Sequence, residues 1–80
     1  MNFTVYIIVS LEGHTYVGYT NNLNRRLIEH NSGKYGYTKI GTDWKVIYCE
    51  TYPSRKEARK REKYLKSHAG KEWLKRRGII

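Results

Sequence analysis

The sequence predicts a small α+β domain with a three-stranded, mainly antiparallel sheet flanked by helices, in the order β-β-α-β-α-α. Three runs rich in β-branched and aromatic residues indicate strands at residues 3–10, 15–19 and 44–51. Amphipathic patterns with start signals indicate helices at residues 23–30, 55–67 and 71–77. We expect one domain over residues 1–80, because a chain this short buries only about 60% of its unfolded surface.

The first helix has an unusual inward face. Thr20, Asn21 and Asn22 are all good N-caps, so the helix is expected to start there. Its inward stripe repeats at i, i+3, i+4 and i+7, and it consists of Leu23, Arg26, Leu27 and His30. Arg25 and Glu29 point the other way and can form a solvent-facing pair. An inward arginine needs a partner, which is either a protein group or a bound ligand.

The second helix also carries a charged group on its inner side. Ser54 to Glu57 form a capping box, which is a strong helix start. The inward stripe that follows consists of Ala58, Glu62 and Leu65. Glu62 is therefore either an ion-pair partner of Lys66 or Arg26, or a site residue. Residues 68–70 are expected to interrupt the helix, and residues 34–43 are expected to form a polar loop.

Charge is concentrated in the C-terminal part of the chain. Residues 51–80 hold eleven Lys and Arg against three Asp and Glu, whereas residues 1–50 hold five against four. This surface favours a polyanionic partner, with nucleic acid ahead of an anionic membrane, because interfacial helices need a larger apolar face. The bland alternative is a soluble, lysine-rich helix.

The single cysteine restricts which metal sites the protein can form and which cellular compartment suits it. Cys49 lies in a strand pattern and is expected to be a small core residue. One cysteine excludes an internal disulfide and a multi-cysteine zinc site. The apolar run Val5–Val9 is too short for a signal-peptide core or a membrane span, so a reducing cytoplasm fits best.

Two tripeptides and three further positions resemble a known family. Val5-Tyr6-Ile7, followed ten residues later by Tyr16-Val17-Gly18, resembles the paired motif of the GIY-YIG nucleases, with Val5 where glycine is usual. The match extends over essentially the whole chain to Arg26, His30 and Glu62. The chain is similar to small stand-alone bacterial members, relatives of the excision-repair nuclease domain and of homing endonucleases.

The resemblance implies a metal-dependent DNA endonuclease related to DNA repair enzymes. It makes Tyr6 the candidate general base, with Tyr16 hydrogen-bonding the phosphate or the attacking water. Arg26 offers a guanidinium fork that matches phosphate oxygens, and His30 would assist proton transfer or orient a neighbour. Glu62 is suited to hold one Mg²⁺ or Mn²⁺ with water ligands. A free phenol ionises only near pH 10, so Tyr6 would need help from Arg26 or the metal.

The loop length between the first two strands tests this assignment. Strand side chains alternate between faces, so a two-residue turn at Glu12 and Gly13 would put Tyr6 and Tyr16 on opposite faces. A three-residue loop or a bulge puts them on one face. We predict the second arrangement, with Gly13 at positive φ, because a shared site requires it.

The basic surface would then carry the substrate. Phosphate contacts of this kind give salt-dependent affinity without base readout, so we expect structure preference rather than sequence preference. The candidate nucleic-acid-binding residues are Lys34, Tyr35, Tyr37, Lys39, Arg55, Arg59, Lys60, Lys63 and Lys66. Two alternatives stay open: a nucleic-acid-binding module with weak or no catalysis, and a nuclease subunit that is active only with a protein partner.

Overall fold

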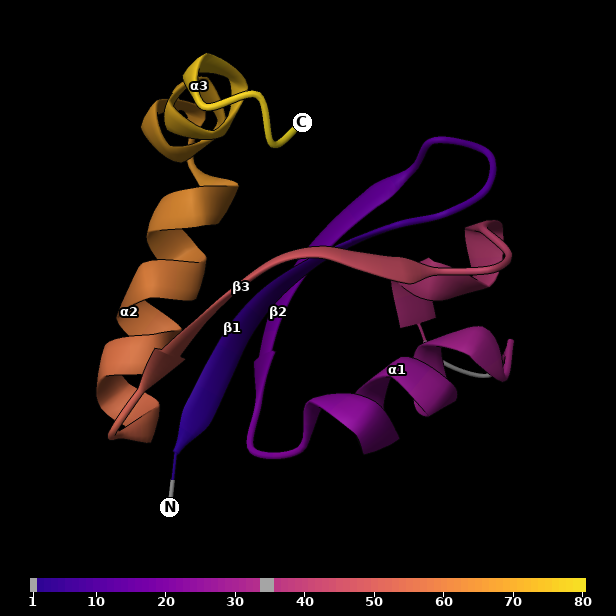
Figure 1. Ribbon diagram of the computed structural model, residues 1–80, viewed down its shortest axis with the longest axis horizontal. Helices are drawn as coiled ribbons and strands as arrows, with labels where there is room; N and C mark the ends of the chain where they lie inside the picture. Colours follow the sequence, from indigo (N-terminus) through magenta and orange to yellow (C-terminus); the bar gives the residue numbers. More distant parts are fainter. Residues whose placement is uncertain (1, 34–35) are drawn as a thin grey trace.

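The computed structural model describes residues 2–33 and 36–80 and confirms the α+β class with a three-stranded antiparallel sheet (Figure 1). It adds a short 3-10 helix, η1, inside the segment expected to be a polar loop. In chain order the elements are β1 (Phe3–Val9), β2 (Thr15–Thr20), α1 (Leu23–Asn31), η1 (Gly36–Ile40), β3 (Lys45–Tyr52), α2 (Arg55–Lys66) and α3 (His68–Arg76). No helix in the described ranges is long and apolar enough to cross a membrane.

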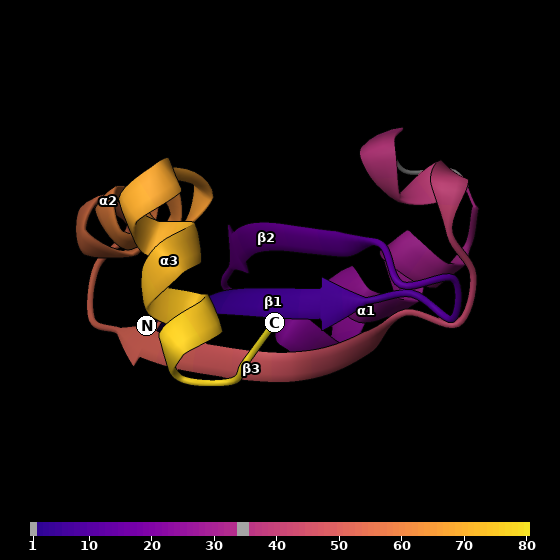
Figure 2. The same ribbon diagram turned by 90° about the horizontal axis from the view of Figure 1, so that it is seen from above.

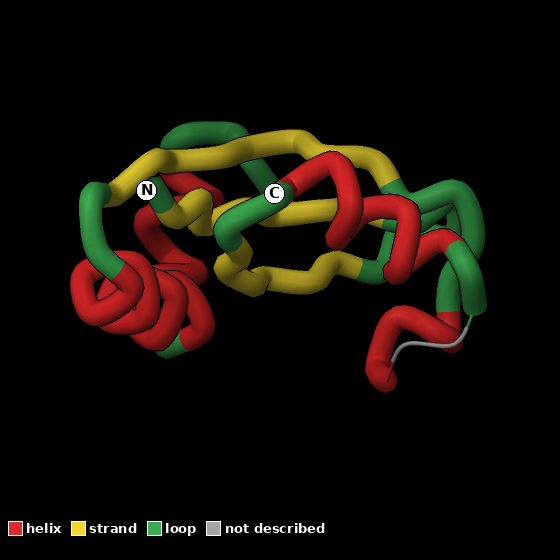
Figure 3. The backbone as a smooth tube through the Cα atoms, turned by 90° about the horizontal axis from the view of Figure 1, so that it is seen from below, coloured by secondary structure: helices red, strands yellow, loops and turns green. Residues whose placement is uncertain are grey.

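The sheet is covered on both faces. Its strand order is β2-β1-β3, which makes β1 the central strand and leaves β2 and β3 as edges (Figure 2). Helices α2 and α3 pack against one face, and α1 packs against the other with η1 beside it (Figure 3). The free edge of β2 therefore runs between α1 and α2, and this is where the candidate site lies.

Alternation along β1 builds two small cores. Val5 and Ile7 point to the α2 side, where they pack with Ala58, Leu65 and Leu74. Val5 is fully buried there, so valine at the usual glycine position contributes to this core. Tyr6 and Ile8 point to the α1 side, where they pack with Trp44 and the partly buried Tyr16, Leu23, Leu27 and Val46.

The hairpin between β1 and β2 has the predicted three-residue loop. The Ser10 N–H donates to the His14 carbonyl at 2.9 Å, and Gly13 has a φ of 94°. The register pairs Tyr6 with Gly18 and places Tyr16 opposite Ile8. Tyr6 and Tyr16 therefore share the α1 face of the sheet, and the prediction is confirmed.

A charged cluster attaches α2 to β3. Both carboxylate oxygens of Glu50 accept from Arg61, at 2.9 Å from Nε and 3.1 Å from Nη2. The hydroxyls of Tyr48 and Tyr52 donate to the same carboxylate. The Arg61 guanidinium also lies over the Trp73 ring of α3, with Cζ 4.7 Å from the ring centroid. This cluster holds both C-terminal helices on the sheet.

Two sequence predictions about this half of the chain are wrong. Residues 68–70 do not interrupt the helix but form the first turn of α3, because Ser67 both ends α2 and caps α3 by accepting the Gly70 N–H at 3.1 Å. Cys49 is exposed rather than a core residue. It lies opposite Tyr6 on edge strand β3, beyond the part of that face covered by α1.

Candidate active site

A cleft of about 360 Å³ runs along the β2 edge between α1 and α2. It brings together three of the predicted catalytic and metal-binding residues, one from each of these elements: Tyr16, Arg26 and Glu62. Its other lining residues are Phe3, Gly18, Tyr19, Thr20, Asn21, Arg25 and Arg55. Three guanidinium groups against one carboxylate make the cleft electropositive, which suits a phosphodiester.

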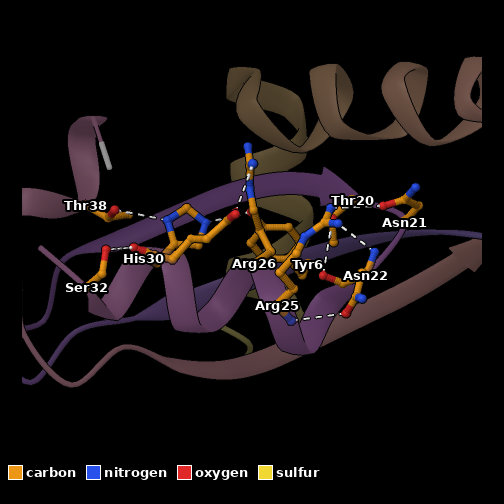
Figure 4. Close-up of polar contacts among 10 residues, drawn as sticks. Tyr6, Thr20, Asn21, Asn22, Arg25, Arg26, His30, Ser32 and Thr38 are labelled. Atoms are coloured by element: carbon orange, nitrogen blue, oxygen red, sulfur yellow. Dashed lines mark hydrogen bonds and ion pairs between the residues drawn. The ribbon is translucent and has the colours of Figure 1, made fainter. Parts of the chain in front are cut away.

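Tyr6 and His30 lie behind the cleft floor. The Tyr6 hydroxyl is 2.7 Å from Nε2 of His30, and each residue is only 1% exposed. Nδ1 of His30 is 3.0 Å from Oγ1 of Thr38 on η1 (Figure 4). In the tautomer with the proton on Nδ1, His30 donates a hydrogen bond to Thr38, and its Nε2 accepts a hydrogen bond from the Tyr6 hydroxyl. Thr38, His30 and Tyr6 thus form a buried polar chain.

The charge state of His30 follows from its surroundings. Burial lowers the pKa of His30 below 6.5, and the nearby Arg26 guanidinium lowers it further, although Glu29 opposes this. His30 is therefore neutral at neutral pH. A neutral imidazole can accept a hydrogen bond, which an imidazolium cannot do.

Gly18 lets the Tyr6 ring reach the cleft floor. A Cβ atom at Gly18 would lie 2.6 Å from the Tyr6 hydroxyl oxygen and 2.8 Å from its Cζ atom. The space that glycine leaves beside the sheet is thus occupied by Tyr6. Because Gly18 itself lines the cleft, the Tyr6 hydroxyl lies directly beneath the cleft surface.

Tyr16 joins this buried chain to the open cleft. Its ring centroid is 6.4 Å from that of Tyr6 and 4.9 Å from that of His30. Unlike Tyr6, Tyr16 is only half-buried and lines the cleft itself. The two motif tyrosines therefore occupy two depths of one site.

The two neighbouring arginines of α1 both face the cleft. Arg26 pairs with Glu29 at 3.5 Å, whereas Arg25 donates to Oδ1 of Asn21 at 3.3 Å. The Arg25–Glu29 pair expected from the sequence is therefore wrong. Arg25 was not predicted to be a site residue. The periodic stripe of α1 identifies the side of the helix that faces the sheet, but it does not identify the side that faces α2.

Glu62 faces the cleft from α2. Its side chain is 15% exposed, and it pairs with Lys66 at 3.2 Å, as one of the sequence alternatives anticipated. Arg55, Glu62 and Lys66 lie at i, i+7 and i+11, which is one stripe of the helix. Within residues 2–33 and 36–80, no three His, Cys, Asp or Glu side chains come together as a metal cage. Mg²⁺ keeps several waters and needs only one or two carboxylates plus substrate phosphates, so Glu62 fits such an ion.

Eight of the nine predicted nucleic-acid-binding residues fall into three groups, and the ninth, Lys66, pairs with Glu62. Lys34 and Tyr35 lie outside the described residues. Tyr37 and Lys39 are exposed on η1. A basic hollow on the outer side of α2 meets the cleft at Arg55, and its lining consists of Arg55, Lys56, Arg59, Lys60 and Lys63.

Thr38 contacts the candidate site residue His30, and sequence reasoning missed it. It lies in the segment expected to be a polar loop, where a threonine carries no periodic or motif signal. Its placement depends on η1 folding back onto α1, where Thr38 becomes 1% exposed. Only the tertiary structure brings it to His30.

Comparison with known proteins gives a consistent result. The model of the family described as the GIY-YIG catalytic domain matches residues 2–76. A UPF0213 protein of Staphylococcus epidermidis is 42% identical over 72 residues, which is 89% of this chain and 88% of that protein. A UPF0213 protein of Streptococcus pneumoniae is 40% identical over 63 residues, or 78% of this chain and 64% of that protein.

A solved structure is also similar. The solution NMR structure of the UPF0213 protein BH0048 from Bacillus halodurans has 35% sequence identity to this chain and a TM-score of 0.56. The match covers 92% of this chain and 82% of that chain.

Proposed function

This chain belongs to the GIY-YIG catalytic domain family, and on that premise we propose that it is a metal-dependent endonuclease acting on DNA. Family membership implies endonuclease-type chemistry in general. The observation that carries the finer proposal is the meeting of Tyr16, Arg26 and Glu62 in one electropositive cleft. Hydrolysis of a phosphodiester needs charge stabilisation, an activated water and help for the leaving oxygen. The cleft, together with Tyr6 and His30 beneath its floor, offers a group for each need.

Arg26 and Arg25 bind the scissile phosphate in this proposal. A guanidinium matches two phosphate oxygens at once and stabilises the charge that develops on them. The 3.5 Å contact with Glu29 is long for a hydrogen bond, and both side chains are partly exposed, so Arg26 can exchange this contact for a phosphate. Tyr16 donates its hydroxyl hydrogen bond to the same phosphate or to the attacking water.

Tyr6 and His30 move the proton. Water in the cleft transfers its proton to the Tyr6 oxygen beside Gly18 while Tyr6 passes its own proton to Nε2 of neutral His30. The Thr38 hydroxyl can accept from Nδ1–H, which supports the tautomer in which Nε2 is the accepting nitrogen. Because His30 takes up the Tyr6 proton, Tyr6 can act as a base without first becoming a phenolate.

Glu62 would hold the divalent metal ion. A bound Mg²⁺ or Mn²⁺ would supply positive charge for a phosphate oxygen and for the leaving oxygen. Lys66, which pairs with Glu62 at 3.2 Å, places a positive charge beside that carboxylate without lining the cleft itself. The remaining ligands would be water and the substrate itself.

The substrate preference follows from the basic hollow on α2. Its lysines and arginines contact the sugar–phosphate backbone, which positions DNA without reading its bases. We therefore propose that the enzyme is selective for DNA structure rather than sequence. From the family resemblance we also propose a role in DNA repair, and from the single cysteine a cytoplasmic location.

A nicking assay tests this proposal. The purified protein is incubated with branched and plain duplex DNA in Mg²⁺, in Mn²⁺ and with chelator. We expect cleavage with either metal, faster on branched DNA, and none with chelator. Binding to both substrates without cleavage under any of these conditions would contradict the enzyme proposal and favour a binding module.

A further inference from the structure

We propose that a second groove beside the cleft binds one unpaired nucleotide of the strand being cut, with its base stacked on Tyr37. This inference rests on the proposed function, because it names the form of DNA that the site takes. The groove, of about 440 Å³, meets the cleft at Tyr16. It is lined by Thr15, Tyr16, Val17, Tyr37, Lys66 and Lys71.

An aromatic stack forms one wall of this groove. The rings of Tyr16 and Tyr37 are stacked, with centroids 5.9 Å apart and planes inclined by 25°. Tyr37 remains 53% exposed in this position. Tyr16 covers one face of the Tyr37 ring, and no other ring among the described residues stacks on Tyr37, so its exposed surface can receive a planar partner. A nucleobase is such a partner, and base–aromatic stacking is how many proteins hold unpaired strands.

Two lysines give the groove its charge. Nζ of Lys66 lies 5.7 Å from the centroid of the Tyr16 ring, and Lys71 of α3 lines the same groove. No acidic side chain is among the groove's lining residues in the part of the chain that the structure describes. Aromatic rings flanked by ammonium groups match the two parts of a nucleotide, its base and its phosphate.

The position of the groove sets which nucleotide it holds. Residues 15–17 line the groove, and residues 16 and 18–20 line the cleft, so the two hollows follow the same edge strand in succession. A strand whose phosphate lies at Arg26 would place a neighbouring nucleotide at Tyr16 and Tyr37. That neighbour must be unpaired, because a base held in a duplex stack cannot also stack on Tyr37.

The chemistry of the groove predicts tolerance of base identity. Its lining side chains are aromatic, aliphatic, hydroxyl or ammonium groups, and none is an amide or a guanidinium of the kind that reads base edges in a bidentate manner. Every base presents a π-face, so the presence of a base should matter more than which base it is.

The test compares two single-stranded oligodeoxynucleotides of about eight residues, one normal and one with abasic residues throughout. Binding is measured by fluorescence anisotropy in chelator, so that no cleavage occurs. Both probes have the same backbone charge, so their affinity ratio reports what the bases contribute, and the Tyr37 variants isolate the part due to stacking on Tyr37. We compare the wild-type protein with Tyr37→Leu, Tyr37→Trp and, as a matched control, Tyr64→Leu, which changes an exposed tyrosine of α2.

We expect the wild-type protein to prefer the normal probe by about tenfold or more. Tyr37→Leu should lose most of this preference, whereas Tyr37→Trp and Tyr64→Leu should keep it. An unchanged preference in Tyr37→Leu, or equal binding of both probes by the wild-type protein, would overturn the groove proposal alone. Failure of the wild-type protein to bind either probe would also overturn the groove proposal, whereas the proposed function stands or falls separately on cleavage in the nicking assay.

Discussion

The Tyr6 hydroxyl and Nε2 of His30 lie 2.7 Å apart, and both side chains are buried beneath the floor of an open cleft. In the direction that the proposed chemistry uses, the Tyr6 hydroxyl donates to Nε2, and this hydrogen bond requires a neutral imidazole. It therefore links the stability of this small domain to pH. It also links the stability to the proposed chemistry, because the same proton would move during cleavage.

The first prediction concerns stability below neutral pH. Burial, assisted by Arg26, lowers the pKa of His30 in the folded protein below 6.5, so the unfolded chain binds this proton more readily. The contribution of neutral His30 is fully present above about pH 6.5 and is lost as the pH falls toward its folded-state pKa. Urea unfolding at pH 7.5 and 5 should show this loss in the wild-type protein and a smaller loss in His30→Gln. His68→Gln, at an exposed site on α3, should behave like the wild-type protein. Equal pH dependence in all three would contradict the assignment.

The second prediction concerns Thr38. Thr38→Val removes the acceptor for Nδ1–H of His30, so the productive tautomer loses its support. We expect the cleavage rate to fall by about tenfold or more and its pH profile to shift. Thr38→Ser keeps the hydroxyl and should restore both the rate and the profile. A normal rate in Thr38→Val, measured by single-turnover kinetics, would remove Thr38 from the proton path.

The third prediction concerns Gly18. Gly18→Ala puts a Cβ atom against the Tyr6 hydroxyl, and Tyr6 cannot move away without breaking its bond to His30. We expect a loss of about 1–3 kcal/mol in the free energy of unfolding, measured with denaturant. The same change in a Tyr6→Ala background should cost clearly less, because the two sites are coupled. Equal costs in both backgrounds would show that the close approach is not what requires glycine.

Much of the fold was accessible from the sequence because the local signals agree with the final structure. The N-cap at Asn22 and the capping box at Ser54 lie at the observed helix starts. The three-residue hairpin loop followed from requiring Tyr6 and Tyr16 to share a face. The predicted start of α3 was wrong, because Ser67 is both the C-cap of α2 and the N-cap of α3. A sequence pattern does not reveal such a double role.

The site was less accessible because its parts meet across elements. Tyr16, Arg26 and Glu62 were selected by motif and by helical stripe, and the structure places them in one cleft. Arg25 and Thr38 were missed. Their positions depend on the packing of α2 near α1 and of η1 on α1, which no local pattern encodes. The same limit applies to Cys49, whose exposure depends on how far α1 extends over the sheet.

The fourth prediction concerns the cluster that attaches α2 to β3. Burial alone would raise the pKa of Glu50, but hydrogen bonds from Arg61, Tyr48 and Tyr52 outweigh it and hold this pKa below its usual value. Glu50→Gln removes the charge and should lower the free energy of unfolding by about 1–3 kcal/mol. Glu72→Gln, at an exposed site on α3, should change it by no more than about 0.5 kcal/mol. Comparable urea midpoints for the two variants would contradict a structural role for Glu50.

Parallel measurements of cleavage and binding on the same branched DNA test most directly whether the cleft between α1 and α2 is the active site. We predict that Arg26→Ala and Glu62→Ala lower the single-turnover cleavage rate by about 100-fold or more while changing the dissociation constant by less than about tenfold. Arg76→Ala, at an exposed arginine of α3, serves as the control and should cleave at the wild-type rate. Wild-type cleavage rates in both Arg26→Ala and Glu62→Ala would show that the reaction takes place elsewhere on the protein.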